Sequence, residues 1–398
     1  MDIKVFFNFK TLRHYYRMVP RPILLVFFPV IAVYRFLKAL YSILRVDVWI
    51  LNGKTVTDGE AVAVFFSGHP RQRQYYDRMV FGGQCEEVYY GKQWVWQLPA
   101  IVRAHRNELD LVVHETHHLV SRWMGERGCI CAPTWINGDM DLSLIDPAQR
   151  SLRSDIINIH KQGFTYEVTA DNALLKTFHA EMYLPYVLER YAPELITVDY
   201  EVLVRLTKHI ELLWVKKDGE RVAGIMLCYK GHDVILKCLG VRPGSEALTK
   251  AGVIPAMYYF LSSYLKDRGG TRIVHGGCRS LFRDGVFTFK RKWGFRITGW
   301  LDNALRIYPV RDSRGLRSFL MYSSIIAFDR GELVGMVFVD KTEGLNEKDI
   351  QDLYRYRLPG LKRVVVYLFE RADPCSKVEA VRQDIELRDF NNLLGPRE

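Results

Sequence analysis

The middle of the chain alternates short apolar runs with one long apolar helix pattern. Residues 233–241 lack a polar face at helical spacing, which predicts a buried strand ending at Arg242-Pro243-Gly244. From residue 255 to residue 265 apolar side chains continue at helical spacing behind a first-turn proline. Residues 271–275 predict a second strand, which ends at Gly276-Gly277. Strand, loop, helix and strand form a parallel crossover, whose loop and helix N-terminus suit a phosphate.

The flanking regions show the same mixture of strand and helix patterns. Before the central stretch, the pattern predicts strands at 61–66, 85–90 and 109–114, a helix at 71–79, and a loop at Thr134-Trp135. A helix over residues 171–190, divided near Pro185, and a hairpin around Asp218-Gly219 come next. After it, the pattern predicts a strand at 303–308 and a ββαβ addition within 322–395.

The N-terminus combines apolar and basic residues. Residues 22–34 form an uncharged apolar run of 13 residues, and a bilayer-spanning helix needs about 20. Residues 35–45 place a basic stripe beside an apolar face. Residues 1–46 hold eight cations against Asp2 alone, or +7 of the formal +11. We expect an anchor on an anionic membrane surface and a cytoplasmic protein attached to the inner face; a packed N-terminal helix is the alternative. DNA binding is not expected, because the rest of the chain is nearly balanced in charge.

Cysteine and histidine patterns favour reduced thiols and no metal. Seven cysteines in a large chain suggest no disulfide framework, and Cys129-Ile130-Cys131 has no second pair for zinc. His114-Glu115-Thr116-His117-His118 matches H-E-x-x-H, but the apolar residues before it predict a strand, which would separate its outer histidines by roughly 13 Å. We therefore expect no zinc, and interpret Glu115 as a cleft carboxylate.

A cluster of cations surrounds one carboxylate at residues 279–296. Six cations accompany Asp284, and phosphate is their natural partner; a solvated basic turn is the alternative. The six are Arg279, Arg283, Lys290, Arg291, Lys292 and Arg296. Asp284 is the expected general base and Lys290 the expected phosphate or oxyanion contact. Cys278 is expected to be inert, because no basic partner is evident.

Several phrases of this region resemble one superfamily. The order of parts is similar to the acyl-donor half of GNAT acyltransferases, and Lys292-Trp293-Gly294-Phe295 resembles their usual ending. Residues 284–294, DGVFTFKRKWG, resemble the branch that includes Fem-type peptidyltransferases and envelope-polysaccharide acyltransferases. Residues 218–224 resemble the superfamily's mid-sheet hairpin. The resemblance covers about residues 155–300.

The phosphate loop departs from the superfamily's pattern. Residues 247–256, ALTKAGVIPA, keep one glycine and one lysine, whereas close approach to a pyrophosphate depends on glycines. The resemblance implies acyl-coenzyme A as donor or, as in Fem-type relatives, an aminoacyl-tRNA. It implies that the donor contacts Val241, Lys250, Gly252, Trp293 and Gly294, and that the acceptor contacts Tyr183, Arg190, Arg279 and Arg283.

Together these features predict an α/β protein built on a GNAT-like mixed sheet flanked by helices. We expect a basic apolar segment at 1–50, a degenerate α/β lobe at 51–154, a GNAT-like acyltransferase domain at 155–310 and an α/β extension at 311–398. The expected activity is acyl or aminoacyl transfer to an amine or hydroxyl of a membrane-associated, lipid-linked envelope or polysaccharide precursor. The alternative is a non-catalytic scaffold that binds an anionic ligand or a partner at the membrane.

Overall fold

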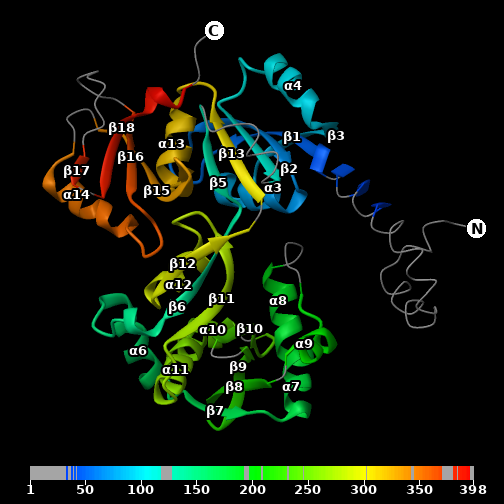
Figure 1. The fold of residues 1–398 in the computed structure, drawn as a ribbon, viewed down its shortest axis with the longest axis vertical. Coiled ribbons are helices and arrows are strands. Elements are labelled where there is room, and N and C mark those ends of the chain that lie inside the picture. Colours follow the sequence, from blue (N-terminus) through cyan, green and yellow to red (C-terminus); the bar gives the residue numbers. More distant parts are fainter. Residues whose placement is uncertain are drawn as a thin grey trace, which may run out of the picture.

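The computed structural model describes residues 33–34, 37–38, 40–41, 43–117, 128–191, 197–207, 209–230, 233–244, 246–301, 303–341, 345–369, 380–382 and 384–394. Two mixed β-sheets, flanked by helices, organise these residues into two lobes stacked one above the other (Figure 1). This arrangement confirms the predicted mixed α/β class. Most of the expected membrane anchor, and His118, lie outside the described residues.

The large-sheet lobe is built from two separate parts of the chain, residues 45–133 and 303–394. Its sheet has the strand order β3-β1-β2-β4-β13-β5-β14-β15-β16-β18-β17 within the described residues. The strands are β1 (Arg45–Lys54), β2 (Ala61–Gly68), β3 (Glu86–Trp94), β4 (Leu111–His117), β5 (Ile130–Pro133), β13 (Asn303–Pro309), β14 (Ile325–Asp329), β15 (Glu332–Val339), β16 (Val364–Leu368), β17 (Ala380–Arg382) and β18 (Ile385–Asp389). The α-helices are α3 (Pro70–Tyr76), α4 (Leu98–Ala104), α13 (Arg314–Tyr322) and α14 (Glu347–Leu353), and a π-helical turn at Asp77–Phe81 extends α3.

The small-sheet lobe comprises residues 135–301. Its sheet has the order β12-β6-β11-β10-β9-β8-β7. The strands are β6 (Trp135–Asp141), β7 (Thr165–Thr169), β8 (His209–Lys217), β9 (Glu220–Lys230), β10 (Asp233–Val241), β11 (Arg272–Arg279) and β12 (Phe295–Trp300). The helices are α6 (Arg150–Lys161), α7 (Asn172–Phe178), α8 (Leu184–Tyr191), α9 (Tyr200–Leu206), α10 (Glu246–Lys250), α11 (Val253–Asp267) and α12 (Gly285–Lys292).

Local sequence signals set several of these elements. The β8–β9 hairpin turns at Asp218 and Gly219, whose φ angles of 54° and 82° are those a tight two-residue turn requires. The helical stretch before Pro185 contains a π-helical turn at His179–Tyr183, so the chain continues into α8 without breaking. The predicted ββαβ addition is confirmed as β14, β15, α14 and β16.

The chain crosses between the lobes along a ribbon of two antiparallel segments. β5 runs into β6 and β12 runs into β13, and these segments pair at the crossing through Thr134 N–H to Asn303 O (2.9 Å) and Leu301 N–H to Trp135 O (3.0 Å). One hydrophobic core also spans the junction, with Phe287 and Phe295 of the small-sheet lobe packed among residues of the other lobe such as Ile326 and Val366. The lobes are therefore joined by backbone pairing and by shared apolar burial.

The lobes differ from the contiguous segments expected from the sequence. The C-terminal strands extend the same sheet that the first lobe begins, through the Phe328–Cys131 pairing of β14 with β5, and do not form a separate extension. The expected loop at Thr134-Trp135 is wrong at Trp135, which opens β6. β6 lies between β11 and β12, so the small-sheet lobe begins before residue 155.

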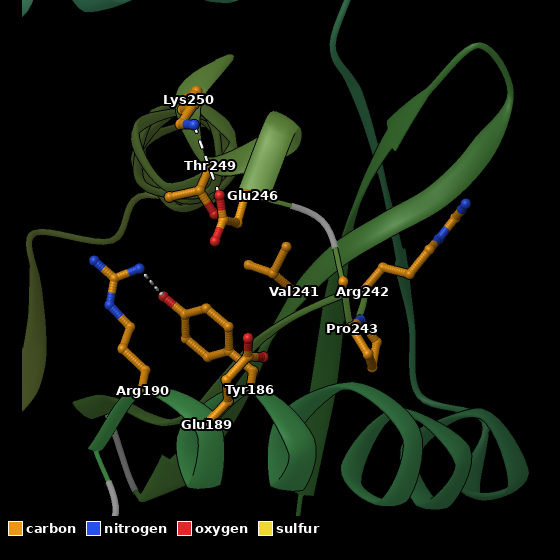
Figure 2. A pocket seen from close by; sticks show the side chains of 10 residues that line it. Tyr186, Glu189, Arg190, Val241, Arg242, Pro243, Glu246, Thr249 and Lys250 are labelled. Atoms are coloured by element: carbon orange, nitrogen blue, oxygen red, sulfur yellow. Dashed lines mark hydrogen bonds and ion pairs between the residues drawn. The ribbon is translucent and has the colours of Figure 1, made fainter.

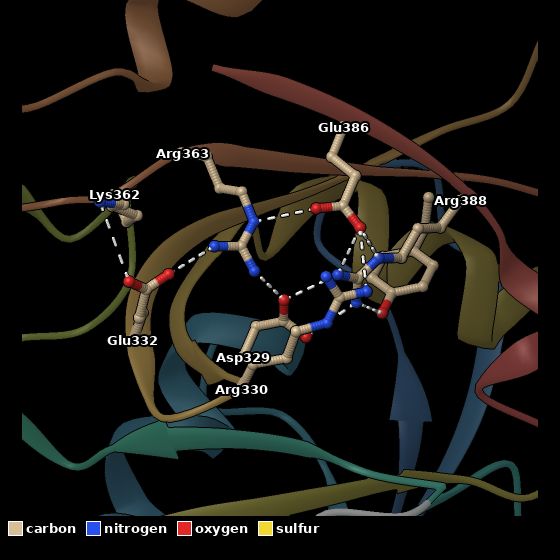
Figure 3. A network of polar contacts seen from close by, with 8 residues as sticks. Asp329, Arg330, Glu332, Lys362, Arg363, Glu386 and Arg388 are labelled. Atoms are coloured by element: carbon tan, nitrogen blue, oxygen red, sulfur yellow. Dashed lines mark hydrogen bonds and ion pairs between the residues drawn. The ribbon is translucent and has the colours of Figure 1, made fainter. Parts of the chain in front are cut away.

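A network of charged side chains ties together the end of the large sheet (Figure 3). Asp329 of β14 accepts two hydrogen bonds from Arg388 of β18, at 2.7 and 2.8 Å, and pairs with Arg363. Arg363 also donates to Glu332 at 2.8 Å and to Glu386 at 2.9 Å. These residues contact one another within the fold. We interpret the network as a structural clamp between β14, β15, β16 and β18.

Candidate functional site

The two parallel strands at the middle of the small sheet diverge. β10 and β11 pair only at Val234 with Ile273 and at Ile235 with Val274. β10 then continues along β9 as far as Val241, and β11 continues along β6 as far as Arg279. The carboxyl halves of the two strands therefore open a gap in the sheet, which is where parallel α/β sheets bind ligands.

Two glycines mark this opening on the β11 side. The pairing of β11 with β6 shifts between His275 and Cys278, so that Gly276 and Gly277 form a bulge. Gly276 is exposed although both of its strand neighbours are at least partly buried, and a Cβ added there would have no heavy atom within 4 Å. The bulge therefore leaves open space at the divergence.

The connection from β10 to β11 begins with the short helix α10 and the first turn of α11. Gly252 caps α11 with a φ of 93°, and a Cβ there would lie 2.8 Å from the Asn158 Nδ2 atom. Asn158 donates to Ala251 O at 2.7 Å, which holds the turn in place. A glycine is thus required here by backbone conformation and by space.

A first cavity, the loop cavity, lies at the carboxyl end of β10 and has a volume of about 330 Å³. Figure 2 shows its walls: α8 on one side, α10 on the other, and the end of β10 between them. Val241, Arg190 and Lys250, three of the predicted site residues, line it, together with Tyr186 and Arg242. Arg190 donates to the Tyr186 hydroxyl at 3.2 Å, and the Lys250 ammonium nitrogen lies 3.6 Å from a Glu246 carboxylate oxygen. Glu189 and Glu246 also line this cavity and offset part of its positive charge.

A second cavity, the inter-lobe cavity, lies at the carboxyl end of β11 and has a volume of about 510 Å³. Residues of both lobes line it: Tyr75, Arg78, Met79, Trp135, Gly277, Cys278, Arg279, Arg283, Asp284, Gly285 and Val286. The structure thus brings together Asp284, Arg279 and Arg283 of the predicted site. The predicted site residues are thus divided between two cavities, one at the end of each diverging strand.

Asp284 and Tyr75 form the central polar pair of the inter-lobe cavity. One Asp284 oxygen accepts the Phe287 N–H at 2.8 Å and caps α12, and the other accepts the Tyr75 hydroxyl at 3.1 Å. Burial raises the pKa of Tyr75 above its ordinary value, and the neighbouring Asp284 raises it further. Tyr75 therefore stays protonated at neutral pH, and its hydroxyl donates a hydrogen bond to Asp284.

Arg279 is enclosed by aromatic rings. Its guanidinium carbon lies 4.1 Å from the Trp135 ring centre and 4.4 Å from that of Tyr75, and it donates to the Gln72 side chain. Arg283 is exposed and stacks over Tyr322 at 4.3 Å. Arg78, from the other lobe, is also exposed at this cavity. Arg283 and Arg78 thus place two cations at the mouth.

The other cations of the predicted cluster point elsewhere. Lys292 pairs with Asp155, Arg296 forms a two-pronged contact with Asp139 at 3.0 and 3.1 Å, and Arg291 donates to Arg355 O. The expectation that six cations act together on phosphate is therefore wrong, because carboxylates and a carbonyl elsewhere in the fold bind these three.

Lys290 lies behind the wall of the inter-lobe cavity. Its ammonium donates to Gly276 O at 2.5 Å and to Gly277 O at 3.3 Å, so it holds the bulge of β11. Burial lowers the pKa of Lys290, while Cys278 and Asp284 oppose that shift. Burial also lowers the pKa of His275 to about 3 and raises the pKa of Cys278 to about 12, so the thiol stays protonated at neutral pH.

Like Gly252 and Lys290, four more predicted residues line neither of the two cavities. Glu115, on β4, accepts from His69 N–H at 2.8 Å and from the Asn303 side chain at 3.2 Å. Tyr183 is buried with Cys238, and Trp293 is buried in the small-sheet core. Gly294 has a φ of 76°, and a Cβ there would lie 2.7 Å from Asp141 O. The structure gives each of these residues a place in the fold, and their assigned roles stay predictions.

Residues 114–117 of the H-E-x-x-H match lie on the strand β4, and His118 lies outside the described residues. His114 is within β4, and its Nδ1 lies 2.6 Å from the Ser67 hydroxyl. Burial lowers the pKa of His114 to about 4, and nearby Arg306 contributes to the shift. Among the residues described, no three His, Cys, Asp or Glu side chains are grouped to hold a metal ion.

Sequence reasoning missed the aromatic side of the site. Tyr75 and Gln72 come from α3, and Trp135 opens β6. The aromatic pair Tyr75-Tyr76 in a helix pattern was a signal, but nothing in the local sequence connects it to Asp284.

No family model and no curated protein matches this chain. Solved structures do match. L-PGS from Bacillus licheniformis is 14% identical with a TM-score of 0.34, and the match covers 69% of this chain and 88% of that one. FemX is 14% identical with a TM-score of 0.34, and the match covers 65% of this chain and 88% of FemX. A GCN5-related N-acetyltransferase from Kribbella flavida is 11% identical with a TM-score of 0.26, and the match covers 62% of this chain and 80% of that protein. These neighbours have GNAT-like folds, and all three TM-scores are below 0.5.

Proposed function

We propose that this protein transfers an acyl or aminoacyl group from a phosphate-bearing donor to an amine or hydroxyl. The divergence of β10 from β11 after two residue pairs carries the proposal, because it opens backbone groups to an extended donor in the middle of a sheet. A cavity at each strand end, one beside the phosphate-type loop and one beside a carboxylate, supplies separate places for donor and acceptor.

The donor's phosphates are assigned to the loop cavity. Arg190, Arg242 and Lys250 surround it, and the N-terminus of α11 at Gly252 lies in the same connection. The acyl chain then runs along the divergence toward the Gly276-Gly277 bulge. Acyl-coenzyme A and aminoacyl-tRNA both combine phosphates with an acyl group, and both are donors to test.

The chemistry is assigned to the inter-lobe cavity. The nucleophile's nitrogen or oxygen attacks the acyl carbon, a new C–N or C–O bond forms, and Asp284 accepts the proton. When the tetrahedral intermediate collapses, the bond to the donor's sulfur or ribose oxygen breaks, and that atom takes up the proton. Tyr75 orients the carboxylate through its hydrogen bond.

The acceptor is proposed to be anionic and membrane-associated. Arg78 and Arg283 stand on opposite lobes at the mouth of the inter-lobe cavity, where a phosphate of a lipid-linked envelope or polysaccharide precursor would be bound. The basic, apolar N-terminus supports attachment to the inner face of the membrane. Among the described residues, no helix is both long enough and apolar enough to cross a bilayer.

A non-catalytic scaffold is the second candidate. One observation favours it: both Asp284 oxygens already accept hydrogen bonds within the fold, as the cap of α12 and from Tyr75. A scaffold of this kind would bind the same anionic ligands without turnover.

A ligand series tests the proposal. The purified protein is heated with acetyl-coenzyme A, with aminoacyl-tRNA, and with their acyl-free counterparts, because a ligand that binds the native state raises the melting temperature. A rise with one acylated donor, followed by transfer of its labelled acyl group to an amine or hydroxyl acceptor, is the expected result. A rise without any transfer would favour the scaffold. No rise with either donor class would overturn the proposal.

A further inference from the structure

One corner of the large-sheet lobe carries exposed aromatic side chains that line neither of the two cavities. Tyr41, Tyr89 and Trp96 are 46%, 53% and 61% exposed. Trp96 stacks on Trp94 with ring centres 4.7 Å apart, and Tyr41 meets Trp94 edge-on at 5.7 Å. We call Tyr41, Tyr89, Trp94 and Trp96 the aromatic corner. Large aromatic rings seldom gather on a surface unless that surface binds something.

The aromatic corner lies where a helical segment joins the edge of the sheet. The described residues between 33 and 44 are helical and lead directly into β1, and β3 is the outermost strand beside β1 (Figure 1). Arg45 stacks over both Tyr41 and Trp94, at 5.7 and 5.8 Å, and so fixes the helix end against the corner. The corner and this helix end therefore form one surface.

The helix end continues the surface with aliphatic side chains. Val33, at the end of the apolar run 22–34, is exposed, and so are Leu37 and Leu40, which follow that run. A segment that packed onto its own lobe would bury such residues. Among the described residues, no other part of the protein covers these three side chains.

The charged and aromatic side chains of this surface indicate the kind of partner that it binds. Lys38 is exposed on the helix and Lys92 on β3, and Arg45 stacks over Tyr41 and Trp94 of the corner. Tryptophan and tyrosine, with apolar rings and a polar edge, together with lysine and arginine, are the residues that settle at the boundary between lipid headgroups and acyl chains. Asp47 pairs with Tyr89 and Lys92, and Glu86 and Glu87 are exposed at the start of β3.

We propose that the aromatic corner and the described helical residues Val33, Leu37, Lys38 and Leu40 form a docking surface for an anionic lipid bilayer, in which Trp96 and Tyr89 insert at headgroup depth. The sequence-based expectation of an anchor rested on residues 22–45, and the aromatic corner adds side chains from β3 and the residues after it to that segment. It does not depend on the proposed transfer activity.

Vesicle sedimentation tests the docking surface with the full chain. Vesicles of phosphatidylcholine containing phosphatidylglycerol are compared with vesicles of phosphatidylcholine alone, for the wild type, Trp96→Ala and Trp300→Ala. Trp300 is the matched control, because it is 51% exposed and lies on β12 of the other lobe. Circular dichroism melting verifies that both variants remain folded.

The wild type is expected to bind the anionic vesicles, and Trp96→Ala to bind them about tenfold more weakly, since a large buried aromatic side chain contributes at least that much. Trp300→Ala should bind as the wild type does. A wild-type protein that stays in the supernatant overturns the proposal. Equal binding by Trp96→Ala and the wild type also overturns it, because the residues before 33 would then account for all the affinity.

Discussion

Replacement of Asp284 separates its role in the fold from its role in transfer. Asp284 caps α12 through one oxygen and accepts the Tyr75 hydroxyl through the other. Asp284→Asn keeps a cap oxygen, so we expect the free energy of unfolding to change by less than about 1 kcal/mol. It removes the charged proton acceptor, so we expect the rate of transfer to fall by about two to four orders of magnitude.

Asp284→Ala provides the contrasting measurement. It removes the cap, which costs about 1 kcal/mol, and leaves the Tyr75 hydroxyl without its acceptor, which costs about 1–3 kcal/mol. We expect the melting temperature to fall by several degrees, at about 2 °C per kcal/mol for a chain of this size.

The double variant Asp284→Ala with Tyr75→Phe completes the comparison. It removes the stranded hydroxyl, so it should be more stable than Asp284→Ala alone. Circular dichroism melting and transfer of a labelled acyl group are measured on all the variants. An Asp284→Asn protein that is folded and transfers at the wild-type rate would refute the assignment of Asp284 as the base.

Three further predictions concern pH, backbone conformation and salt. Burial alone would raise the pKa of Asp329, but Arg388 and Arg363 bring it below the ordinary 3.8; its stabilising contribution is therefore full above that pH and is lost as the pH falls through the lowered value. Asp329→Asn should lower the melting temperature at pH 7 and have less effect near pH 3; an equal loss at both would contradict the pairing. Gly294→Ala should cost about 1–3 kcal/mol, because the residue has a φ of 76° and a Cβ would meet Asp141 O, whereas Gly299→Ala, with open space, should cost less. Arg283→Ala should weaken acceptor binding most at low salt, and salt-independent weakening would argue against a phosphate contact.

Local patterns predicted much of the small-sheet lobe. The apolar run 233–241 matches β10, and the Asp218-Gly219 turn gives the β8–β9 hairpin. Both depend on neighbours in sequence, so periodicity and turn chemistry are sufficient for them.

The pairing of distant strands was not predictable in this way. β6 lies beside β11 and β12, and β5 beside β13 and β14, because the chain crosses twice between the lobes. Residues 130–141 are apolar at the start and polar in Asn137-Gly138-Asp139, so the local pattern gives no continuous strand. A contiguous division into lobes was therefore wrong.

The site was only partly predictable for the same reason. The sequence brought Asp284, Arg279 and Arg283 together because they are close along the chain. Tyr75 is 209 residues from Asp284, and the carboxylates that bind Lys292 and Arg296 lie far upstream at Asp155 and Asp139. Those contacts decide which cations remain in the cavity, and no local pattern contains them.

Filling the divergence of β10 and β11 tests the central claim most directly. Gly276→Val places a branched side chain in the opening without a steric contact within 4 Å of its Cβ, and Gly299→Val is the control at another strand glycine with equal room. Donor binding is measured by equilibrium titration with the acylated donor that stabilises the wild type. We predict that Gly276→Val stays folded and loses donor binding by at least tenfold, whereas Gly299→Val binds as the wild type does. Unchanged binding by a folded Gly276→Val protein would contradict the proposal that the donor lies between these two strands.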